Sequence, residues 1–244
     1  MATLTCSGLS KSFGGLRAVQ NVSFAAQSGR ILSIIGPNGA GKTTVFNLLT
    51  GFIPADSGSV QLDDRPLAGL SPEDRCRAGL VRTFQVVQPF RGLTVLENVV
   101  MGAMLRTASI AEAREAAAAV LDDLGMSRLA GLRAGSLSIG DRKRLEMAKV
   151  LATRPSVLLL DEVMGGLIPI EVQRMIAFIH GLRDRGLAVV VIEHHMSAVM
   201  RLSDEILVLQ NGEPIAQGSP KEISRDPKVL SAYLGPNFKA DGGL

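Results

Sequence analysis

Residues 31–44 read ILSIIGPNGAGKTT, a short apolar run that breaks into a glycine-rich loop ending in Lys-Thr. The segment matches the pattern G-x-x-x-x-G-K-[ST] with its fixed places at Gly36, Gly41, Lys42 and Thr43. Glycines let consecutive backbone N–H groups curl around a polyphosphate, where a Cβ would collide with it. The sequence therefore predicts a nucleoside triphosphate site made of Gly36, Pro37, Asn38, Gly39, Ala40, Gly41, Lys42, Thr43 and Thr44.

Two side chains of this loop have predicted roles toward the phosphates. Lys42 is expected to reach the β and γ phosphates, and the Thr43 hydroxyl is expected to ligate Mg²⁺. The helix predicted over residues 42–49, ending at Gly51, turns its positive end toward the anion. The alternative is a glycine turn with an exposed lysine, which the strand before the loop and the helix after it disfavour.

Length and composition restrict the classes of protein to which the chain can belong. With 244 residues, of which 46% are hydrophobic and 20% charged, the chain suits one substantial globular core. No window approaches the roughly 18 to 20 apolar residues that span a bilayer, and residues 1–13 lack the apolar core of a signal peptide. We therefore expect a cytoplasmic protein that can still dock on a membrane protein. A formal charge of +3 does not indicate a nucleic-acid partner.

The order of periodic segments predicts the organisation of the chain. Strands are expected near residues 4–7, 22–26, 30–35, 59–62, 80–84, 157–160, 188–192, 205–209 and 214–216. Between residues 87 and 151 strand signals give way to helical periodicity, with Ser109 predicted to cap a helix that Gly125 ends. Ser71 and Pro72 open a further helix, and residues 171–183 form another. We predict an α/β core over 1–87 and 152–244, with an inserted helical subdomain over 88–151.

The second chemical signal is VLLLDE at residues 157–162, an apolar strand that ends in two acids. Asp161 at the strand end can hold the water shell of Mg²⁺. Glu162 can orient and deprotonate a water that attacks the γ-phosphate. The alternative is a core strand with solvated acids at its exit, which the phosphate loop makes the weaker interpretation.

The third signal, Leu-Ser-Ile-Gly at residues 137–140, precedes an apparent helix shortly before VLLLDE. Here the chain resembles the ATP-binding subunit of an ABC transporter, which has a Leu-Ser-Gly-Gly-Gln-like signature in this place. The resemblance implies that Ser138 and Gly140 contact the γ-phosphate held by a second subunit. A serine and a glycine at a helix N-terminus also suit an anion. Alone, Ser138-x-x-Asp141 is equally a capping box that needs no nucleotide.

The resemblance assigns further residues. It implies that Phe13 stacks on adenine, that Gln85 bridges the Mg²⁺ and attacking-water region to the helical subdomain, and that His194 hydrogen-bonds the γ-phosphate. The catalytic set is then Glu162, His194, Lys42 and Gln85, and the Mg²⁺ ligands are Thr43, Gln85 and Asp161. His195 stands where the family commonly has Asp, and His180 is interpreted as a surface residue.

The family implies a P-loop NTPase fold: a RecA-like α/β core, an accessory antiparallel β region and a helical subdomain. It implies ATP and Mg²⁺, a second cassette, identical or not, transmembrane permease subunits and, indirectly, a periplasmic solute-binding protein. The protein would lie on the inner face of the cell membrane. KSFGGLRAV, VRTFQ, IEHHM and AYLG look like the subgroup serving branched-chain amino acid importers. Related members are similar to cassettes for urea or short amides and for lipopolysaccharide export.

Three other functions stay open at this point. An ABC-type ATPase acting on DNA or ribosomes usually carries a long coiled coil or two fused cassettes, which do not fit this length. A regulatory module without turnover is suggested by Asp141 and Ile168, which replace the usual Gln or Glu and the usual Asn or Asp; Val163 likewise replaces the usual Pro. A small-molecule phosphotransferase explains the phosphate loop but not the signature or His194.

Overall fold

The structure is a computed structural model that describes residues 2–84 and 88–234. Its strands are β1 (Thr3–Phe13), β2 (Leu16–Gln27), β3 (Ile31–Ile35), β4 (Ser57–Leu62), β5 (Arg65–Pro66), β6 (Leu80–Arg82), β7 (Val157–Asp161), β8 (Ala188–Ile192), β9 (Glu205–Gln210) and β10 (Glu213–Gly218). Its α-helices are α1 (Lys42–Thr50), α2 (Pro72–Ala78), α3 (Val95–Ala103), α4 (Ile110–Asp123), α5 (Ile139–Ala152), α6 (Pro169–Asp184), α7 (Met196–Leu202), α8 (Pro220–Ile223) and α9 (Pro227–Leu234). Two 3₁₀ turns span Ser127–Leu129 and Ala134–Ser136.

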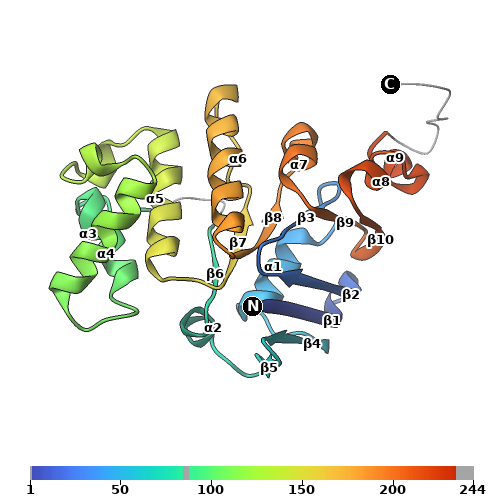
Figure 1. The fold of residues 1–244 in the computed structure, drawn as a ribbon. Helices are drawn as coiled ribbons and strands as arrows, with labels where there is room; N and C mark the ends of the chain where they lie inside the picture. Colours follow the sequence, from blue (N-terminus) through green and yellow to red (C-terminus); the bar gives the residue numbers. More distant parts are fainter. Residues whose placement is uncertain (1, 85–87, 235–244) are drawn as a thin grey trace.

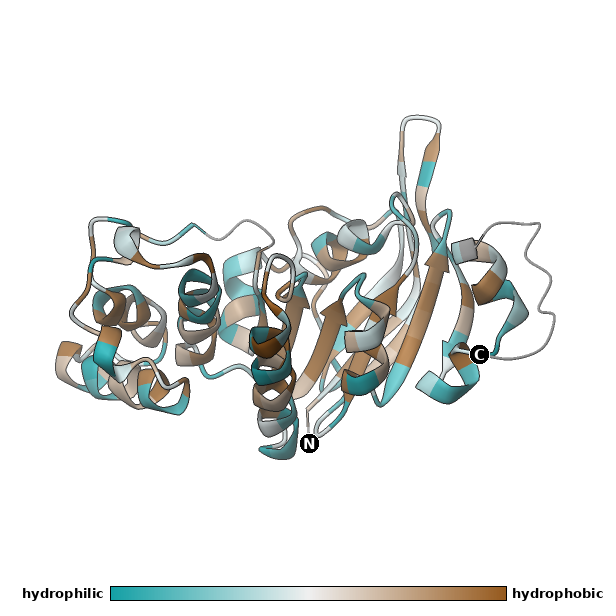
Figure 2. Cartoon of the chain, turned by 90° about the horizontal axis from the view of Figure 1, so that it is seen from above, coloured by the Kyte–Doolittle hydropathy of each residue, from teal (hydrophilic) through white to brown (hydrophobic). Residues whose placement is uncertain are grey.

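The main sheet has the strand order β10-β9-β3-β8-β7-β6 in the described part of the chain. Its strands run parallel except β10, which returns antiparallel to β9. Every residue of β3, β7 and β8 is buried, as expected for parallel strands covered on both faces. Figure 2 shows hydrophobic residues concentrated on these strands. The predicted continuous apolar strands 157–160 and 188–192 are thus confirmed.

Alternate residues of these strands face two separate apolar clusters, because side chains alternate across a sheet. Ile31, Leu158 and Val189 pack in one cluster with residues of α5 and α6. Leu32, Leu159 and Val190 pack in another with residues of α1 and of the first two strands. Figure 1 shows α6 and α1 on opposite faces of the sheet. The main sheet is therefore the middle layer.

A second sheet, of order β2-β1-β4-β5 in the described residues, is antiparallel. Its hairpin of β1 and β2 is longer than the predicted strands 4–7 and 22–26, and those bounds were wrong. Gly8 has φ of 62°, and the pairing register shifts between Cys6 and Leu9. This irregularity breaks the period-two alternation of apolar and polar residues. The outer half of β1 therefore could not be recognised as a strand from the sequence.

Helices α3, α4 and α5 lie side by side away from the antiparallel sheet (Figure 1). Ser109 and Ser138 cap α4 and α5, since each hydroxyl accepts from the backbone N–H three residues on, at 3.3 and 3.1 Å. The helix start predicted at Ser109 is confirmed, and Ser138 caps its helix as the capping-box alternative expected. Among the described helices, none has the length and apolar character that crossing a bilayer requires.

The carboxyl ends of the parallel strands meet at one edge of the main sheet, where ligands bind in open α/β sheets. The phosphate loop follows β3, Asp161 ends β7 with Glu162 directly after it, and residues 193–195 follow β8. The strand predicted over 80–84 ends earlier, at Arg82. Gln85, predicted to approach this edge, lies outside the described residues.

Candidate functional site

The phosphate loop is held by contacts of its own backbone. Gly36 has φ of 152°, and a Cβ there would lie 2.1 Å from the Leu209 carbonyl oxygen. Gly41 has φ of 96°, and its Cβ would lie 2.3 Å from the Ala18 carbonyl oxygen. The fold itself therefore requires glycine at these two positions, even without a bound phosphate. The sequence had suggested a different reason, namely close approach of the backbone to phosphate. At Gly39 a Cβ would meet nothing within 4 Å, so the space beside this residue is open to a ligand.

Lys42 begins α1 and turns its side chain back over the loop. It is 8% exposed, and its ammonium donates to the carbonyl oxygens of Gly36 at 2.8 Å and Pro37 at 3.0 Å. Burial lowers the pKa of Lys42 below its usual value, and the nearby carboxylates of Glu162 and Asp161 only partly oppose this lowering. The Lys42 ammonium thus donates hydrogen bonds to carbonyl oxygens, and phosphate oxygens can replace these as acceptors.

A cavity of about 460 Å³ opens over the loop, within the size range of small-molecule sites. It brings together the loop, the tip of the β1–β2 hairpin and the end of β7. Phe13 lies on the hairpin and is 47% exposed, so its ring is available for stacking. The lining residues are Phe13, Leu16, Arg17, Ala18, Asn38, Gly39, Ala40, Gly41, Lys42, Thr43, Thr44, Glu162 and Asn211.

Glu162 and His194 meet at the ends of two neighbouring strands. Nδ1 of His194 lies 3.8 Å from Oε1 of Glu162, and both side chains are partly exposed. Glu162 adopts φ of 49°, a left-handed conformation that is uncommon for a residue with a side chain. The sequence predicted both residues from separate segments, and the structure places them beside each other.

Asp161 is bound to Arg82, a residue that the sequence interpretation missed. Oδ2 of Asp161 accepts from Arg82 Nη2 at 2.7 Å, with both side chains at most 6% exposed. Burial raises the pKa of Asp161, and the Arg82 guanidinium opposes that rise. Arg82 also donates to Asn47 and lies 4.8 Å from the ring centroid of Phe84. The available signal was an arginine inside a buried strand, which requires an anionic partner.

An Arg82→Met protein is expected to lose about 3 kcal/mol or more of unfolding free energy, because Asp161 keeps its buried charge without a partner. Urea unfolding of the nucleotide-free protein measures the loss. Arg77→Met is the matched control, because Arg77 pairs with Asp74 at 3.5 Å on the exposed surface of α2. Its loss should stay below about 1 kcal/mol. Equal losses in both variants would contradict the assignment of a structural ion pair.

Lys143, also missed, connects α5 to the backbone around Glu162. Its ammonium donates to the carbonyl oxygens of Glu162 at 3.1 Å and Val163 at 3.2 Å. Burial lowers the pKa of Lys143, while Glu193 and Glu162 raise it. The lysine holds the left-handed turn at Glu162, at the position where Val163 lacks the backbone restraint of proline. Its partners are carbonyl groups, which a sequence pattern does not mark.

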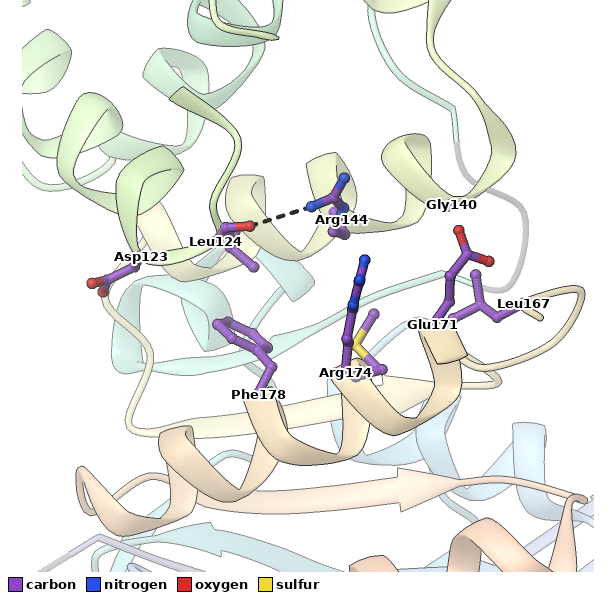
Figure 3. A pocket seen from close by; sticks show the side chains of 9 residues that line it. Asp123, Leu124, Gly140, Arg144, Leu167, Glu171, Arg174 and Phe178 are labelled. Atoms are coloured by element: carbon purple, nitrogen blue, oxygen red, sulfur yellow. Dashed lines mark hydrogen bonds between the residues drawn. The ribbon is translucent and has the colours of Figure 1, made fainter. Parts of the chain in front are cut away.

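Ser138 and Gly140 lie at the start of α5, outside the set of described residues that line the nucleotide cavity. The Ser138 hydroxyl donates to Asp141 Oδ2 at 2.8 Å, and Asp141 also pairs with Arg144. The structure shows one half of the predicted capping box, the bond from Asp141 N to Ser138. Gly140 borders a different hollow of 170 Å³ between α5 and α6, where Glu171 approaches it (Figure 3).

The sequence profile of the ABC transporter family matches residues 19–165, and a profile of branched-chain amino acid ATP-binding cassette transporters matches residues 213–235. The chain therefore belongs to the ABC transporter family. It is a nucleotide-binding ATPase subunit with the P-loop NTPase fold, as the sequence predicted.

Individual relatives agree with this membership. The chain is 42% identical to the high-affinity branched-chain amino acid transport ATP-binding protein LivG of Salmonella typhimurium, covering 95% of this chain and 97% of LivG. It is 40% identical to BraF of Pseudomonas aeruginosa, which carries the same description, over the same shares. Among solved structures, the ADP conformation of MJ1267, an ATP-binding cassette of an ABC transporter, matches with a TM-score of 0.87 and 32% identity. That match covers 96% of this chain and 99% of MJ1267.

Proposed function

We propose that this chain hydrolyses ATP to energise uptake of branched-chain amino acids, or of related small amides and amino acids, across the cytoplasmic membrane. The observation that carries the proposal is the cavity in which the phosphate loop and Glu162 meet, beside His194. The solute class is supported by the 42% identity to LivG over 95% of the chain. The lipopolysaccharide export system ATP-binding protein LptB of Escherichia coli is also similar to this chain, at 37% identity.

Each residue of the site has a proposed part in the reaction. Lys42 leaves the carbonyls of Gly36 and Pro37 and binds the β and γ phosphates, with the loop N–H groups around it. Glu162 takes the proton of the attacking water, and His194 holds the γ-phosphate. Phe13 stacks on the adenine ring.

Thr43 and Asp161 would hold Mg²⁺, with Gln85 as the third proposed ligand. The donors of Thr43 and Asp161 are oxygens, which suits this cation, although Arg82 already occupies one oxygen of Asp161. When bound, Mg²⁺ neutralises charge on the phosphates. Asp161 would offer the cation a carboxylate oxygen while Arg82 keeps its bond to Oδ2.

We propose that residues 88–151 form a helical subdomain that carries the signature motif, inserted into an ATP-binding core of residues 1–87 and 152–244. Ser138 and Gly140 would complete the site of a second cassette, identical or homologous, because they lie outside the cavity of their own chain. Permease subunits would dock near Gln85 and the helices after it, on the inner face of the membrane. A periplasmic solute-binding protein would act through the permeases.

Uptake by intact cells tests the proposed solute. Deleting the gene in its source organism should abolish ATP-dependent uptake of radiolabelled leucine, and the wild-type gene should restore it. A Glu162→Gln gene should fail to restore uptake although the protein accumulates to the same level. Normal leucine uptake in the deletion strain would refute the solute class, while hydrolysis by the purified protein would still show the ATPase.

Lys143 is proposed as a positioning residue for Glu162. Lys143→Met should lower kcat about 10- to 100-fold with KM unchanged, because losing two bonds to the Glu162 turn displaces the carboxylate. Lys143→Arg should restore part of kcat. Lys149→Met is the control on the same helix, since Lys149 pairs with Glu146 at 3.1 Å. A rise in KM with kcat unchanged would instead assign Lys143 to nucleotide binding.

A further inference from the structure

Three consecutive residues after β8 gather metal-binding atoms. Glu193, His194 and His195 each offer one ligand atom, and these atoms lie within 4.8 Å of one another. The two imidazole rings lie 4.3 Å apart between centroids. The Glu193 side chain is fully buried, whereas the histidine side chains are about half exposed. A buried carboxylate thus lies under two imidazoles that solvent reaches.

The buried carboxylate is held in one orientation. Oε1 of Glu193 accepts from the Met164 N–H at 2.8 Å, which leaves Oε2 turned toward the histidines. Oε2 lies 3.4 Å from Nδ1 of His195 and 3.3 Å from the backbone nitrogen of His194. In a tetrahedral zinc site with bonds of 2.0 to 2.1 Å, two ligand atoms lie about 3.3 Å apart. Oε2 of Glu193 and Nδ1 of His195 already have this spacing.

A further oxygen donor comes from the neighbouring strand. Oε1 of Glu162 lies 3.8 Å from Nδ1 of His194, so that a cation held by His194 lies within reach of Glu162. Two imidazoles and two carboxylates suit a borderline cation of the zinc type, whereas Mg²⁺ requires hard oxygen ligands. The Lys143 ammonium, bound to the Glu162 carbonyl, opposes the cation and limits its affinity.

We propose that Glu193, His194 and His195 form a binding site for Zn²⁺ or a chemically similar divalent cation, separate from the proposed Mg²⁺ ligands. Occupation of this site takes His194 away from the γ-phosphate position and draws Glu162 toward the cation. Zinc-type cations therefore inhibit the ATPase by binding to the protein itself. This inhibition rests on the proposed catalytic roles of Glu162 and His194, but the binding site does not.

Zinc binding is measured without nucleotide, by competition with a chromophoric zinc indicator, and Co²⁺ serves as a spectroscopic probe. Wild-type protein should bind Zn²⁺ and give the visible absorption of tetrahedral Co²⁺. His195→Asn should weaken Zn²⁺ binding by at least about tenfold, since even outer-shell partners of a metal ligand contribute that much. Unchanged affinity in His195→Asn, with its fold verified by circular dichroism, would overturn the site.

Two matched variants exclude other ligands. His180→Asn should keep the wild-type affinity, because His180 lies on α6 with its Nε2 3.3 Å from the Leu202 carbonyl oxygen. His180 is partly exposed in this position. Cys76→Ser should bind Zn²⁺ like the wild type as well. Loss of binding in either variant would assign the cation elsewhere and overturn the proposal.

Turnover gives a separate readout. Zn²⁺ should inhibit wild-type ATPase, a zinc-selective chelator should reverse the inhibition, and His195→Asn should hydrolyse ATP normally and resist Zn²⁺. Zinc binding without inhibition would overturn the inhibitory role alone. Absence of hydrolysis in zinc-free wild-type protein with MgATP would contradict the proposed function, and the indicator titration would still decide the zinc site.

Discussion

A Glu162→Gln protein is expected to bind MgATP as well as the wild type and to hydrolyse it at least roughly 10²-fold more slowly. The amide keeps the size of the side chain but accepts no proton from the attacking water. The phosphate loop, Lys42 and Phe13 are untouched, so the contacts proposed for binding remain. ATP should consequently persist between Ser138 and Gly140 of one cassette and the loop of another.

Oligomeric state measures this outcome directly. Glu162→Gln with MgATP should elute as a dimer in size-exclusion chromatography with light scattering, and as a monomer without nucleotide. Glu213→Gln, an exposed change on β10, is the control and should hydrolyse ATP at the wild-type rate. A Glu162→Gln protein that stays monomeric with saturating MgATP would contradict the proposal that two cassettes share each site.

A Lys42→Met protein is expected to lose ATP affinity by about 10²-fold or more. Two charge-assisted hydrogen bonds to phosphate, each contributing about 1.5 to 3 kcal/mol, disappear with the ammonium. Methionine fills a similar volume, so the wall of the cavity remains. The Gly36 and Pro37 carbonyls lose their buried donor, so a modest fall in melting temperature should accompany the lost affinity.

Isothermal titration with ATP in the presence of Mg²⁺ measures the affinity, and circular dichroism verifies that the variant folds. Lys221→Met, at an exposed position on α8, is the matched control and should titrate like the wild type. If Lys42→Met bound ATP with wild-type affinity, the phosphates would have to lie away from α1, contrary to the proposed placement.

Local signals were enough to predict the elements around the site. The phosphate loop needs an apolar strand, glycines and a following helix in one continuous stretch of sequence, and β3 and α1 begin and end close to the predicted bounds. The strand 188–192 was predicted with the bounds that the structure has, because a continuous apolar run of strand length marks a buried parallel strand. The family resemblance then supplied Phe13 and His194, which composition alone does not distinguish from core or surface residues.

Contacts between distant segments were not predicted. Arg82 and Asp161 are 79 positions apart, and Lys143 is 19 positions from the Glu162 carbonyl that it holds. The order of strands in the sheet and the packing of α5 determine the partners of Arg82 and Lys143. The periodicity of the sequence contains no information on either. The sequence explained the glycines of the loop by close approach of the backbone to phosphate. In the structure, Gly36 and Gly41 are needed because a Cβ would clash with the carbonyl oxygens of Leu209 and Ala18.

The contact of Gly36 with Leu209 also bears on the synthesis of the chain. The loop precedes β9, the strand whose Leu209 carbonyl lies against it, by some 170 positions in the chain. Gly212, just beyond that strand, donates its N–H to the Ala40 carbonyl oxygen. A growing polypeptide on the ribosome therefore cannot make these two contacts of the loop until β9 and Gly212 have emerged.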